Sequence, residues 1–373
     1  MKKTAFQSAT RVLIFMSVFS LFVYVANLVV YEALAGMFAL IAPWQLWLLG
    51  GILGGFSASF ILANLIGMRF YTAFSRTYYY ISAIWMGFFA YLFLLSVVYG
   101  FLLMVIAIPM ATSVGLVLLA SAAVASIYGV LHARNIQVTL IEVTLPNLPE
   151  IWRGRKAVWV SDIHLGQIHG PKFAEKIVKK VNALPHDIIF IGGDLYDGTG
   201  APDIVELAAP LAHFSAPLGT FFITGNHEEI GDASAFIAAV QSAHIKTLID
   251  EMVEIDGLQL IGVDYRNASD RETFAATLAG FHIDPAKPSI LLKHEPKDLD
   301  IARDAGISFQ ISGHTHFGQQ WPLGYIAKLI YKGCAYGLKK LGDMQVYTSS
   351  GVGTWGPPIR VGTNAEIVHI TFW

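Results

Sequence analysis

Acidic and imidazole side chains gather in one short stretch of the chain, "SDIHLGQIHG" at residues 161–170. It directly follows the apolar run "AVWV", which predicts a strand that ends at this point. The arrangement recurs further along the chain, where strand-like runs end in aspartate, asparagine or histidine. The residues placed in this way are Asp162, His164, Asp194, Asn226, His227, His294, His314 and His316. Carboxylate, amide and imidazole groups bind metals, so the pattern predicts a metal site assembled from several strands.

The number of these groups indicates more than one ion. In open α/β sheets the carboxyl ends of the strands face one crevice, so distant segments converge there. Two ions that share a carboxylate would use all the ligands, and an imidazole-rich set suits Zn, Mn, Fe or Co. Such a pair would hold a hydroxide and polarise a phosphoryl oxygen. Glycines at 192, 193, 225 and 313 allow the tight turns that direct the ligands inward.

The order of the motifs resembles the calcineurin-like metallophosphoesterase superfamily. The matching segments read "SDIHLG", "GGDLYDG", "TGNHEE", "LLKHEP" and "SGHTHFGQ", and they cover roughly residues 156–320. The resemblance implies these metal ligands: Asp162, His164 and His316 for one ion, Asn226, His294 and His314 for the other, and Asp194 as the bridge. It also implies that His227 protonates the leaving oxygen. By the same resemblance Asp197 orients His227, and the alternative is that Asp197 caps a helix or forms a turn.

Two departures from known patterns bear on the substrate. The sequence "GHTHFGQ" and the apolar front resemble the membrane-associated branch, which includes transmembrane proteins with a metallophosphoesterase domain and bacterial UDP-diacylglucosamine pyrophosphohydrolases. That branch reads GHTHGGQ, so Phe317 replaces a glycine and is expected to reshape the edge of the pocket. Phosphoprotein phosphatases carry two arginines in these motifs, and here Thr224 occupies one of the positions. Because such arginines clamp a terminal phosphate, their absence favours a diester or pyrophosphate.

Three further features have both a functional and a structural interpretation. Arg266 and Arg360 each follow a predicted strand, so each is either a phosphate-binding residue or a surface or structural arginine. His169 matches no motif and fits a loop histidine. The segment "PLGYIAKLIYKGCAYGLKK", at 322–340, mixes apolar residues with four lysines. It is either a solvated loop or a rim that touches anionic lipid headgroups.

The front of the chain is apolar. Residues 1–133 contain six charged side chains, and residues 134–373 contain the other 46. Four apolar runs, near 11–31, 45–67, 79–106 and 111–132, are long enough to span a bilayer. A soluble four-helix bundle is the alternative, but the runs lack the polar stripe of a soluble helix. The sequence therefore predicts a four-helix transmembrane domain over 1–133.

Basic residues predict the orientation of these spans. They occur before the first span, between the second and third, and after the fourth: Lys2, Lys3, Arg11, Arg69, Arg76 and Arg134. The connections 32–44 and 107–111 contain no Lys or Arg. The positive-inside rule then predicts a multi-pass protein of the plasma (inner) membrane with both termini and the catalytic domain in the cytoplasm. Residues 32–44 either lie flat at the outer interface or extend the first span.

Residues 134–373 have the pattern of an α/β domain, with β-rich runs alternating with helical periodicity. We expect mixed β-sheets flanked by helices, because near-continuous apolar strands are typical of sheets covered on both faces. This part has 20 basic and 26 acidic residues, which argues against a nucleic-acid partner. The single cysteine, Cys334, excludes an internal disulfide framework.

Together these features predict a membrane-bound phosphoesterase that uses two divalent ions and His227 as general acid. The expected substrate is a phosphodiester or pyrophosphate in a membrane-associated or lipid-linked molecule, and the bilayer is the expected partner. Two alternatives stay open: a membrane-anchored phosphodiesterase for soluble or cyclic nucleotides, and a receptor or scaffold that binds without cleaving. An acid at His227 favours catalysis, because a binding module has no use for one.

Overall fold

The structure is a computed structural model. It describes residues 2–106, 111–198, 203–230 and 233–373, with side chains from Ser17 onward. The side chains of Lys2, Lys3 and Arg11, on which part of the predicted orientation rests, lie outside the described residues. Most of the predicted connection 107–111 and the first residue of a helix expected at 202–214 also lie outside them.

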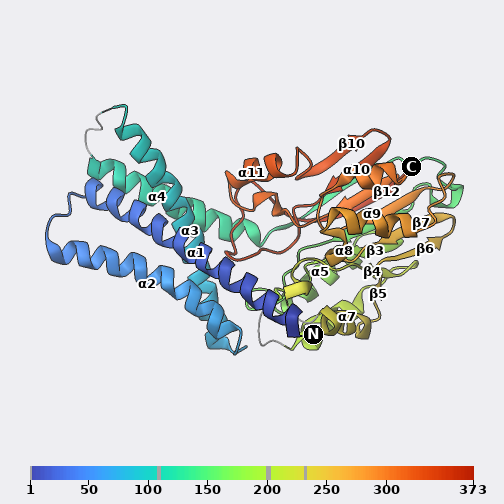
Figure 1. The fold of residues 1–373 in the computed structure, drawn as a ribbon, viewed down its shortest axis with the longest axis horizontal. Coiled ribbons are helices and arrows are strands. Elements are labelled where there is room, and N and C mark those ends of the chain that lie inside the picture. Colours follow the sequence, from blue (N-terminus) through green and yellow to red (C-terminus); the bar gives the residue numbers. More distant parts are fainter. Residues whose placement is uncertain (1, 107–110, 199–202, 231–232) are drawn as a thin grey trace. The chain divides into compact units, whose positions relative to one another are not determined.

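The chain divides into two compact units (Figure 1). The first comprises residues 1–65 and 78–128, and the second comprises residues 66–77 and 129–373. Four long helices run through the front of the chain: α1 (Lys2–Met37), α2 (Pro43–Gly67), α3 (Ala73–Leu103) and α4 (Ala111–Ala133). All four are long and apolar enough to cross a membrane, as the sequence predicts. Helix α1 continues to Met37, so residues 32–37 extend the helix of the first span.

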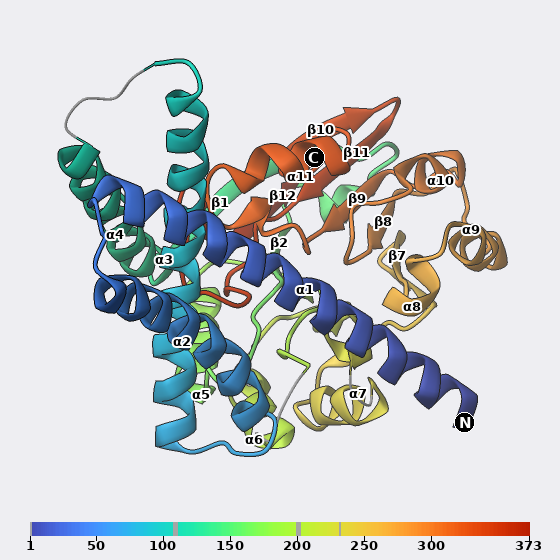
Figure 2. The same cartoon turned by 60° about the vertical axis from the view of Figure 1, so that its left-hand side comes forward.

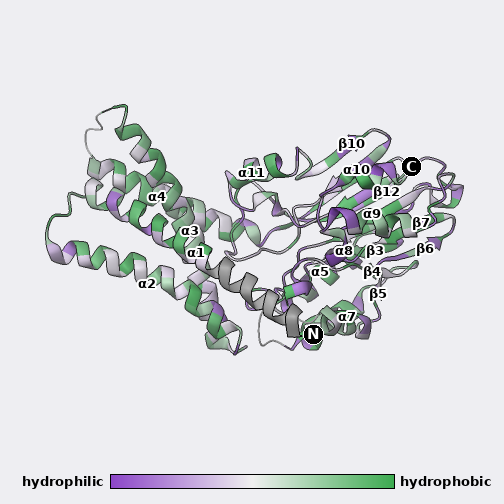
Figure 3. Ribbon diagram, viewed as in Figure 1, coloured by the Kyte–Doolittle hydropathy of each residue, from purple (hydrophilic) through white to green (hydrophobic). Residues whose placement is uncertain are grey.

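The helices of the first unit pack through a small core and expose most of their apolar surface. Green predominates along the coloured parts of α1–α4 in Figure 3, where green marks hydrophobic residues. The core includes Val30 of α1, Leu53 of α2 and Phe89 of α3. Polar side chains pair between helices, as when Asn27 Nδ2 donates to Ser57 Oγ at 3.0 Å. Exposed apolar faces with a few internal polar pairs are typical of helices packed in lipid.

The second unit contains two six-stranded mixed sheets. The first has the order β1 (Ile136–Val143), β12 (Ala365–Phe372), β2 (Lys156–Val160), β3 (Ile188–Ile191), β4 (Thr220–Phe222), β5 (Lys246–Thr247). The second has the order β10 (Gly337–Leu341), β11 (Met344–Thr348), β9 (Phe309–Ser312), β8 (Ser289–Leu292), β7 (Leu258–Gly262), β6 (Glu251–Ile255). Strands β2 to β5 are parallel to one another, and so are β7, β8, β9 and β11.

The two sheets pack face to face, and helices cover their outer faces. Trp159 and Phe190 of the first sheet share a buried core with Ile290 and Phe309 of the second. The outer face of the first sheet packs against α5 (Pro171–Asn182), α6 (Ile204–Ala208) and α7 (Ala233–Ser242). The outer face of the second packs against α8 (Tyr265–Ala268), α9 (Arg271–Gly280) and α10 (Leu299–Asp304). Figure 2 shows α9 and α10 beside β8 and β9. The predicted α/β architecture is confirmed.

Local sequence explains where several of these helices begin. Helix α5 starts at Pro171, where a missing N–H is harmless, and it buries one face through residues such as Ile177 and Val181. The Asp203 carboxylate accepts hydrogen bonds from two N–H groups in the first turn of α6. Residues 322–340, expected to be a loop or a rim, form the helix α11 (Leu323–Ile330) followed by strand β10.

The segment 66–77, between α2 and α3, belongs to the second unit. The Gln167 side chain donates to the carbonyls of Gly67 at 2.9 Å and Phe70 at 3.0 Å. In return, Arg76 Nε donates to the Gln167 carbonyl at 3.2 Å. Gln167 lies in the opening motif, three residues after His164, so this segment is hydrogen-bonded to a loop that carries candidate ligands.

The core between the two sheets gives a stability prediction. Phe190→Ala should lower the free energy of unfolding by about 3–5 kcal/mol, because it leaves a cavity among fully buried side chains. Denaturant unfolding of the full-length protein in detergent measures this change. The matched control is Leu140→Ala on β1, where the side chain is 73% exposed and the expected change is under about 0.5 kcal/mol. Equal losses in the two variants would contradict the packed inter-sheet core.

Candidate metal centre

Both sheets deliver the candidate ligands at the carboxyl ends of their strands. Asp162 and His164 follow β2, Asp194 follows β3, and Asn226 follows β4 in the first sheet. His294 follows β8 in the second sheet, and the same sheet supplies two more histidines after β9. The structure brings the carboxylates and imidazoles of this set into three overlapping groups. The site therefore forms along the edge where the two sheets meet.

The first group contains Asp162, His164 and His316, all buried. The Nε2 atoms of the two histidines lie 3.0 Å apart, and His316 Nε2 lies 3.6 Å from Asp162 Oδ1. Burial, together with the neighbouring His164 and Arg360, lowers the pKa of His316 well below its ordinary value. The imidazole of His316 is thereby kept neutral, which is the form that binds metals.

The second group contains Asp194, His294 and His314, with Asn226 beside them. His314 Nδ1 lies 2.7 Å from Asn226 Oδ1 and 3.3 Å from His294 Nε2. The other ring nitrogen of His294 donates to the Gly192 carbonyl at 2.7 Å. This outer hydrogen bond fixes the tautomer and directs Nε2 of His294 into the site, as is usual for metal-binding histidines.

Asp194 lies between the two groups. Its Oδ2 atom is 3.3 Å from His294 Nε2 and 3.9 Å from His164 Nε2. Burial alone favours the neutral carboxyl, but the His294 imidazole holds the pKa of Asp194 well below its usual range. For His294, burial opposes the charged form, yet the Asp194 carboxylate raises its pKa to about 10. The Asp194 carboxylate is thus paired with a protonated His294, and a metal ion bound here would take the place of that proton.

The backbone holds each carboxylate by one oxygen. Asp162 Oδ1 accepts the His314 N–H at 2.9 Å, and Asp194 Oδ1 accepts the His227 N–H at 2.9 Å. Among the described residues, Asp162 Oδ2 is buried without a hydrogen-bond partner. An unpartnered buried carboxylate oxygen is costly unless something else binds it. Together with the imidazole nitrogens, this oxygen fits a divalent metal.

The ligand loops have unusual backbone conformations. Positive φ angles, between 46° and 69°, occur at five ligands: Asp162, His164, Asp194, His314 and His316. Left-handed conformations at residues other than glycine cost on the order of 1 kcal/mol or more each, and they concentrate at functional sites. A Cβ at Gly225 would overlap Asp194 Oδ1, and a Cβ at Gly313 would overlap Asp162 Oδ2. These glycines are therefore needed for close approach to the carboxylates.

The comparisons with known proteins agree with this arrangement. Residues 155–318 match the family described as Calcineurin-like phosphoesterase. An uncharacterized metallophosphoesterase of Aquifex aeolicus is 32% identical over 229 residues, which cover 58% of this chain and 84% of that protein. The chain belongs to the calcineurin-like phosphoesterase family. The resemblance seen in the sequence motifs is thereby confirmed.

Other members of the calcineurin-like phosphoesterase family share more of this chain. The transmembrane protein with metallophosphoesterase domain of Bos taurus is 35% identical over 271 residues, which cover 66% of this chain and 60% of that protein. An uncharacterized metallophosphoesterase of Campylobacter jejuni is 34% identical over 236 residues, covering 62% of each chain. The chain therefore spans about three fifths of the length of these two relatives.

His227 lies beside the candidate ligands. Its Nδ1 donates to the Asp197 carbonyl at 2.8 Å, which leaves Nε2 4.0 Å from Asp194 Oδ2. The pKa of His227 is lowered, mainly by burial, although the nearby carboxylates of Asp194 and Asp197 raise it in part. The side chain of Asp197 instead lies 3.4 Å from His164 Nδ1. Asp197 thus contacts His227 through its backbone and the ligand His164 through its carboxylate.

Glu228 is a residue of the site that the sequence reading did not single out. Its buried carboxylate accepts four backbone N–H groups, from Asp194, Leu195, Tyr196 and Gly225, at 2.7–3.2 Å. Burial and the Asp194 carboxylate raise the pKa of Glu228 to about 7. Glu228 ties the loop after β3 to the loop after β4. The signal in the sequence was its position directly after "GNH".

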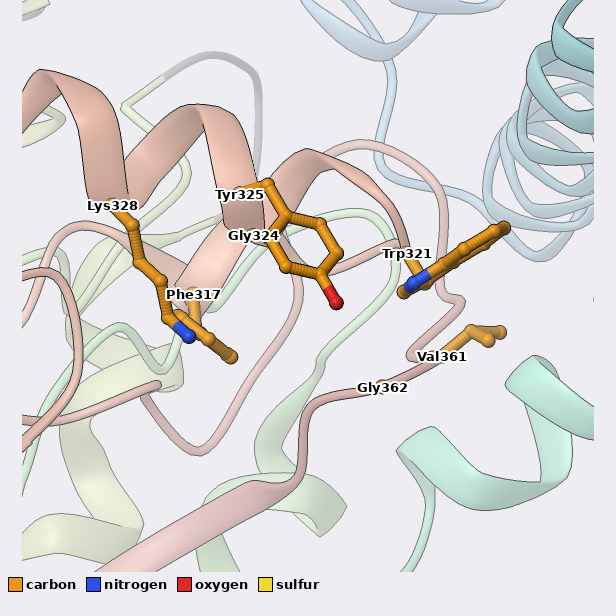
Figure 4. Close-up of a pocket in the computed structure, with 7 residues that line it drawn as sticks. All are labelled: Phe317, Trp321, Gly324, Tyr325, Lys328, Val361 and Gly362. Atoms are coloured by element: carbon orange, nitrogen blue, oxygen red, sulfur yellow. The ribbon is translucent and has the colours of Figure 1, made fainter.

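The predicted substrate-binding residues occupy different environments. Arg360 is fully buried and donates to the carbonyls of Ser350, Gly353 and Asn364 at 2.6–2.8 Å. Arg266 is exposed and pairs with Glu229. The His169 ring is hydrogen-bonded to the Thr354 hydroxyl, as expected for a histidine that supports a loop. Phe317, which directly follows the candidate ligand His316 in the chain, lines a pocket (Figure 4). Of the three predicted contacts, Phe317 alone borders this pocket.

The close approach at Gly225 gives a prediction about metal binding. Gly225→Ala should weaken metal affinity about 10–100-fold, the usual effect of disturbing a group that supports a ligand, because its Cβ displaces the Asp194 carboxylate. Titration of the metal-free full-length protein with Mn²⁺ or Zn²⁺ measures the change. Gly280→Ala is the matched control, since a Cβ there meets nothing within 4 Å. Unchanged affinity in Gly225→Ala would argue against Asp194 as a ligand.

Proposed function

We propose that this protein is a two-metal phosphohydrolase that cleaves a phosphodiester or pyrophosphate bond in a membrane-associated, lipid-linked substrate. The observation that carries the proposal is the position of Asp194. Its Oδ2 lies 3.9 Å or less from imidazoles of both ligand groups, as expected for a carboxylate shared by two ions. Two divalent ions are therefore part of the proposal, with Mn, Zn, Fe or Co suited to the ligands.

The ligands divide into two sets around Asp194. Asp162, His164 and His316 would hold one ion, and Asn226, His294 and His314 would hold the other. When bound, such ions polarise the phosphoryl oxygens and lower the pKa of water. The protein supplies the fixed orientation of these groups, through the backbone hydrogen bonds to Asp162 and Asp194 and the Gly192 carbonyl behind His294.

His227 is the proposed general acid. Because the Asp197 carbonyl accepts from Nδ1, the free Nε2 is the atom that carries and releases the catalytic proton. As water bonds to phosphorus and the bond to the leaving oxygen breaks, Nε2–H transfers its proton to that oxygen. Burial lowers the pKa of His227 and so makes its proton easier to release, while the Asp194 carboxylate near Nε2 opposes this effect.

The nearby residues support a diester or pyrophosphate over a phosphomonoester on a protein. Thr224 occupies a position where phosphoprotein phosphatases carry an arginine. Its hydroxyl donates to Asp264 at 2.6 Å and accepts the Tyr265 N–H at 2.9 Å, so it is engaged away from any substrate. Arg266 and Arg360 are also paired with protein groups. A diester or pyrophosphate linkage carries less negative charge on the reacting phosphate than a terminal phosphomonoester, so it fits a site without a free arginine among these residues better.

Membrane association supports a lipid-linked substrate. The chain has four helices able to cross a membrane, and relatives from Bos taurus and Danio rerio are named as transmembrane proteins with a metallophosphoesterase domain. The test is the activity of full-length protein in proteoliposomes, with metal added back, against a lipid-linked pyrophosphate, a small soluble diester and a small monoester. We expect the lipid-linked substrate to give the highest kcat/KM. A preference for the soluble diester would favour the soluble-nucleotide alternative.

The assignment of acid and ligands gives a paired prediction. His227→Ala should keep two metals per chain and lose on the order of 10²–10⁴ in kcat, the usual contribution of a general acid. Asp194→Asn should lose bound metal as well as activity, because it removes the shared ligand. Elemental analysis of chelator-free preparations and steady-state rates measure both effects. Loss of metal in His227→Ala, or one metal at saturation in the wild type, would refute the division of roles.

The proposed orientation places the catalytic unit in the cytoplasm at the plasma membrane. The native thiol is a poor reporter, since Cys334 is only 8% exposed. A variant combining Cys334→Ala with Asp343→Cys places one thiol in the exposed turn between β10 and β11. A membrane-impermeant maleimide should label it in inverted vesicles and leave it unlabelled in intact cells. Labelling in intact cells would place the catalytic unit outside.

A further inference from the structure

Helix α11 exposes apolar side chains that a helix in water normally buries. Leu329 is 80% exposed and Ile330 is 65% exposed, and Trp321, Tyr325 and Ile326 are each more than half exposed. The helix rests on the unit through small residues, with Ala327 buried and Gly324 close to the Phe317 backbone. We define these five exposed residues as the α11 surface. Contiguous exposed apolar residues of this kind mark an interaction site.

The segment that carries the α11 surface has charged residues of one sign. Residues 319–341 contain Lys328, Lys332, Lys339 and Lys340 and no aspartate or glutamate, although the whole chain has a net charge of −2. Apolar side chains with lysines and interfacial aromatics are typical of helices that lie in the headgroup region of a bilayer. A protein partner would need a matching acidic, apolar face. An anionic bilayer already meets both requirements, and four helices of the same chain are able to span one.

A pocket of about 140 Å³ lies beside the α11 surface. Trp321, Tyr325 and Lys328 line this pocket together with Phe317, which directly follows the candidate ligand His316 in the chain. The Lys328 Nζ lies 5.3 Å from the centre of the Phe317 ring and 5.7 Å from that of Tyr325 (Figure 4). The Lys328 ammonium can pair with the phosphate of a lipid headgroup, and the aromatic rings can pack against the apolar part of the lipid.

We propose that the α11 surface inserts into the lipid headgroup region, and that the pocket beside it receives the headgroup of a lipid-linked substrate. The first part stands on the exposed apolar residues and the lysines. The second part rests on the proposed function, because it assigns the pocket to the substrate of the metal centre. The occupant is membrane lipid in both parts.

Spin labelling tests the first part without any activity. In a Cys334→Ala background, the full-length protein carries a nitroxide at Leu329→Cys in vesicles of phosphatidylcholine and phosphatidylglycerol. We expect this nitroxide to be accessible to O₂ and protected from a water-soluble nickel chelate. Ile151→Cys is the matched control, being 57% exposed and located before the amino end of β2, whereas the ligands follow its carboxyl end. A nitroxide at residue 329 as accessible to nickel as the one at 151 would overturn the proposal.

The amount of protein in the vesicles separates lipid from a second copy of the chain. Protection by lipid is independent of the protein-to-lipid ratio, and it should weaken when phosphatidylglycerol is omitted, because the lysines lose their anionic partners. Protection that disappears on dilution of the protein in the bilayer would identify a second copy and overturn the assignment to lipid.

Kinetics test the second part. The double variant Leu329→Ser, Ile330→Ser should lower the ratio of kcat/KM on a lipid-linked pyrophosphate to that on a small soluble diester by about tenfold. Ile151→Ser should leave that ratio unchanged. An unchanged ratio in the double variant would remove the pocket from substrate capture. If neither substrate is hydrolysed by the wild type with metal added, the proposed function fails, and the spin-label result still decides the docking of the α11 surface.

Discussion

The arrangement of the second unit depends on one carboxylate that is buried where its two sheets meet. Asp194 is almost fully buried, and a buried negative charge is costly unless other groups compensate it. One of its oxygens is fixed by a backbone N–H, and the other faces imidazoles from both sheets. Both sheets must therefore end at the same edge, and the core between them, with Trp159 and Phe309, keeps their edges in register.

The sequence was sufficient to predict that the candidate ligands come together, because of a simple regularity. Each ligand directly follows a short apolar strand, and parallel strands end at a common edge. Asp162 and His294, which come from different sheets, could be assigned to one site without knowledge of the packing. The four long helices were equally predictable, since length and hydropathy alone identify them. The end of α1 was harder to predict. The residues after 31 are apolar, and this fits both an extension of the span and a segment that lies flat at the interface.

Other parts of the site depend on loop conformation, which sequence patterns do not encode. The role of Glu228 arises because four N–H groups of two loops point at one carboxylate. Arg360 follows a strand in the same way as a substrate-binding arginine would, and only the path of residues 349–364 shows that its guanidinium meets backbone carbonyls. Helix α11 was not predicted, although Leu323, Ile326 and Ile330 recur at helical spacing. The sequence does not show that this apolar face is exposed.

Because of the hydrogen bonds of Gln167, residues 129–373 are not independent of the segment that connects α2 and α3. A fragment that begins after α4 would lack the carbonyls of Gly67 and Phe70, and the amide of Gln167 would lose both acceptors. That amide lies in the loop of Asp162 and His164, so the segment 66–77 and this loop belong to the same structural unit. Exchange of the front for an unrelated anchor would leave this loop incompletely supported. The two halves are therefore expected to have been inherited together, with the segment between α2 and α3 changing in step with the opening motif.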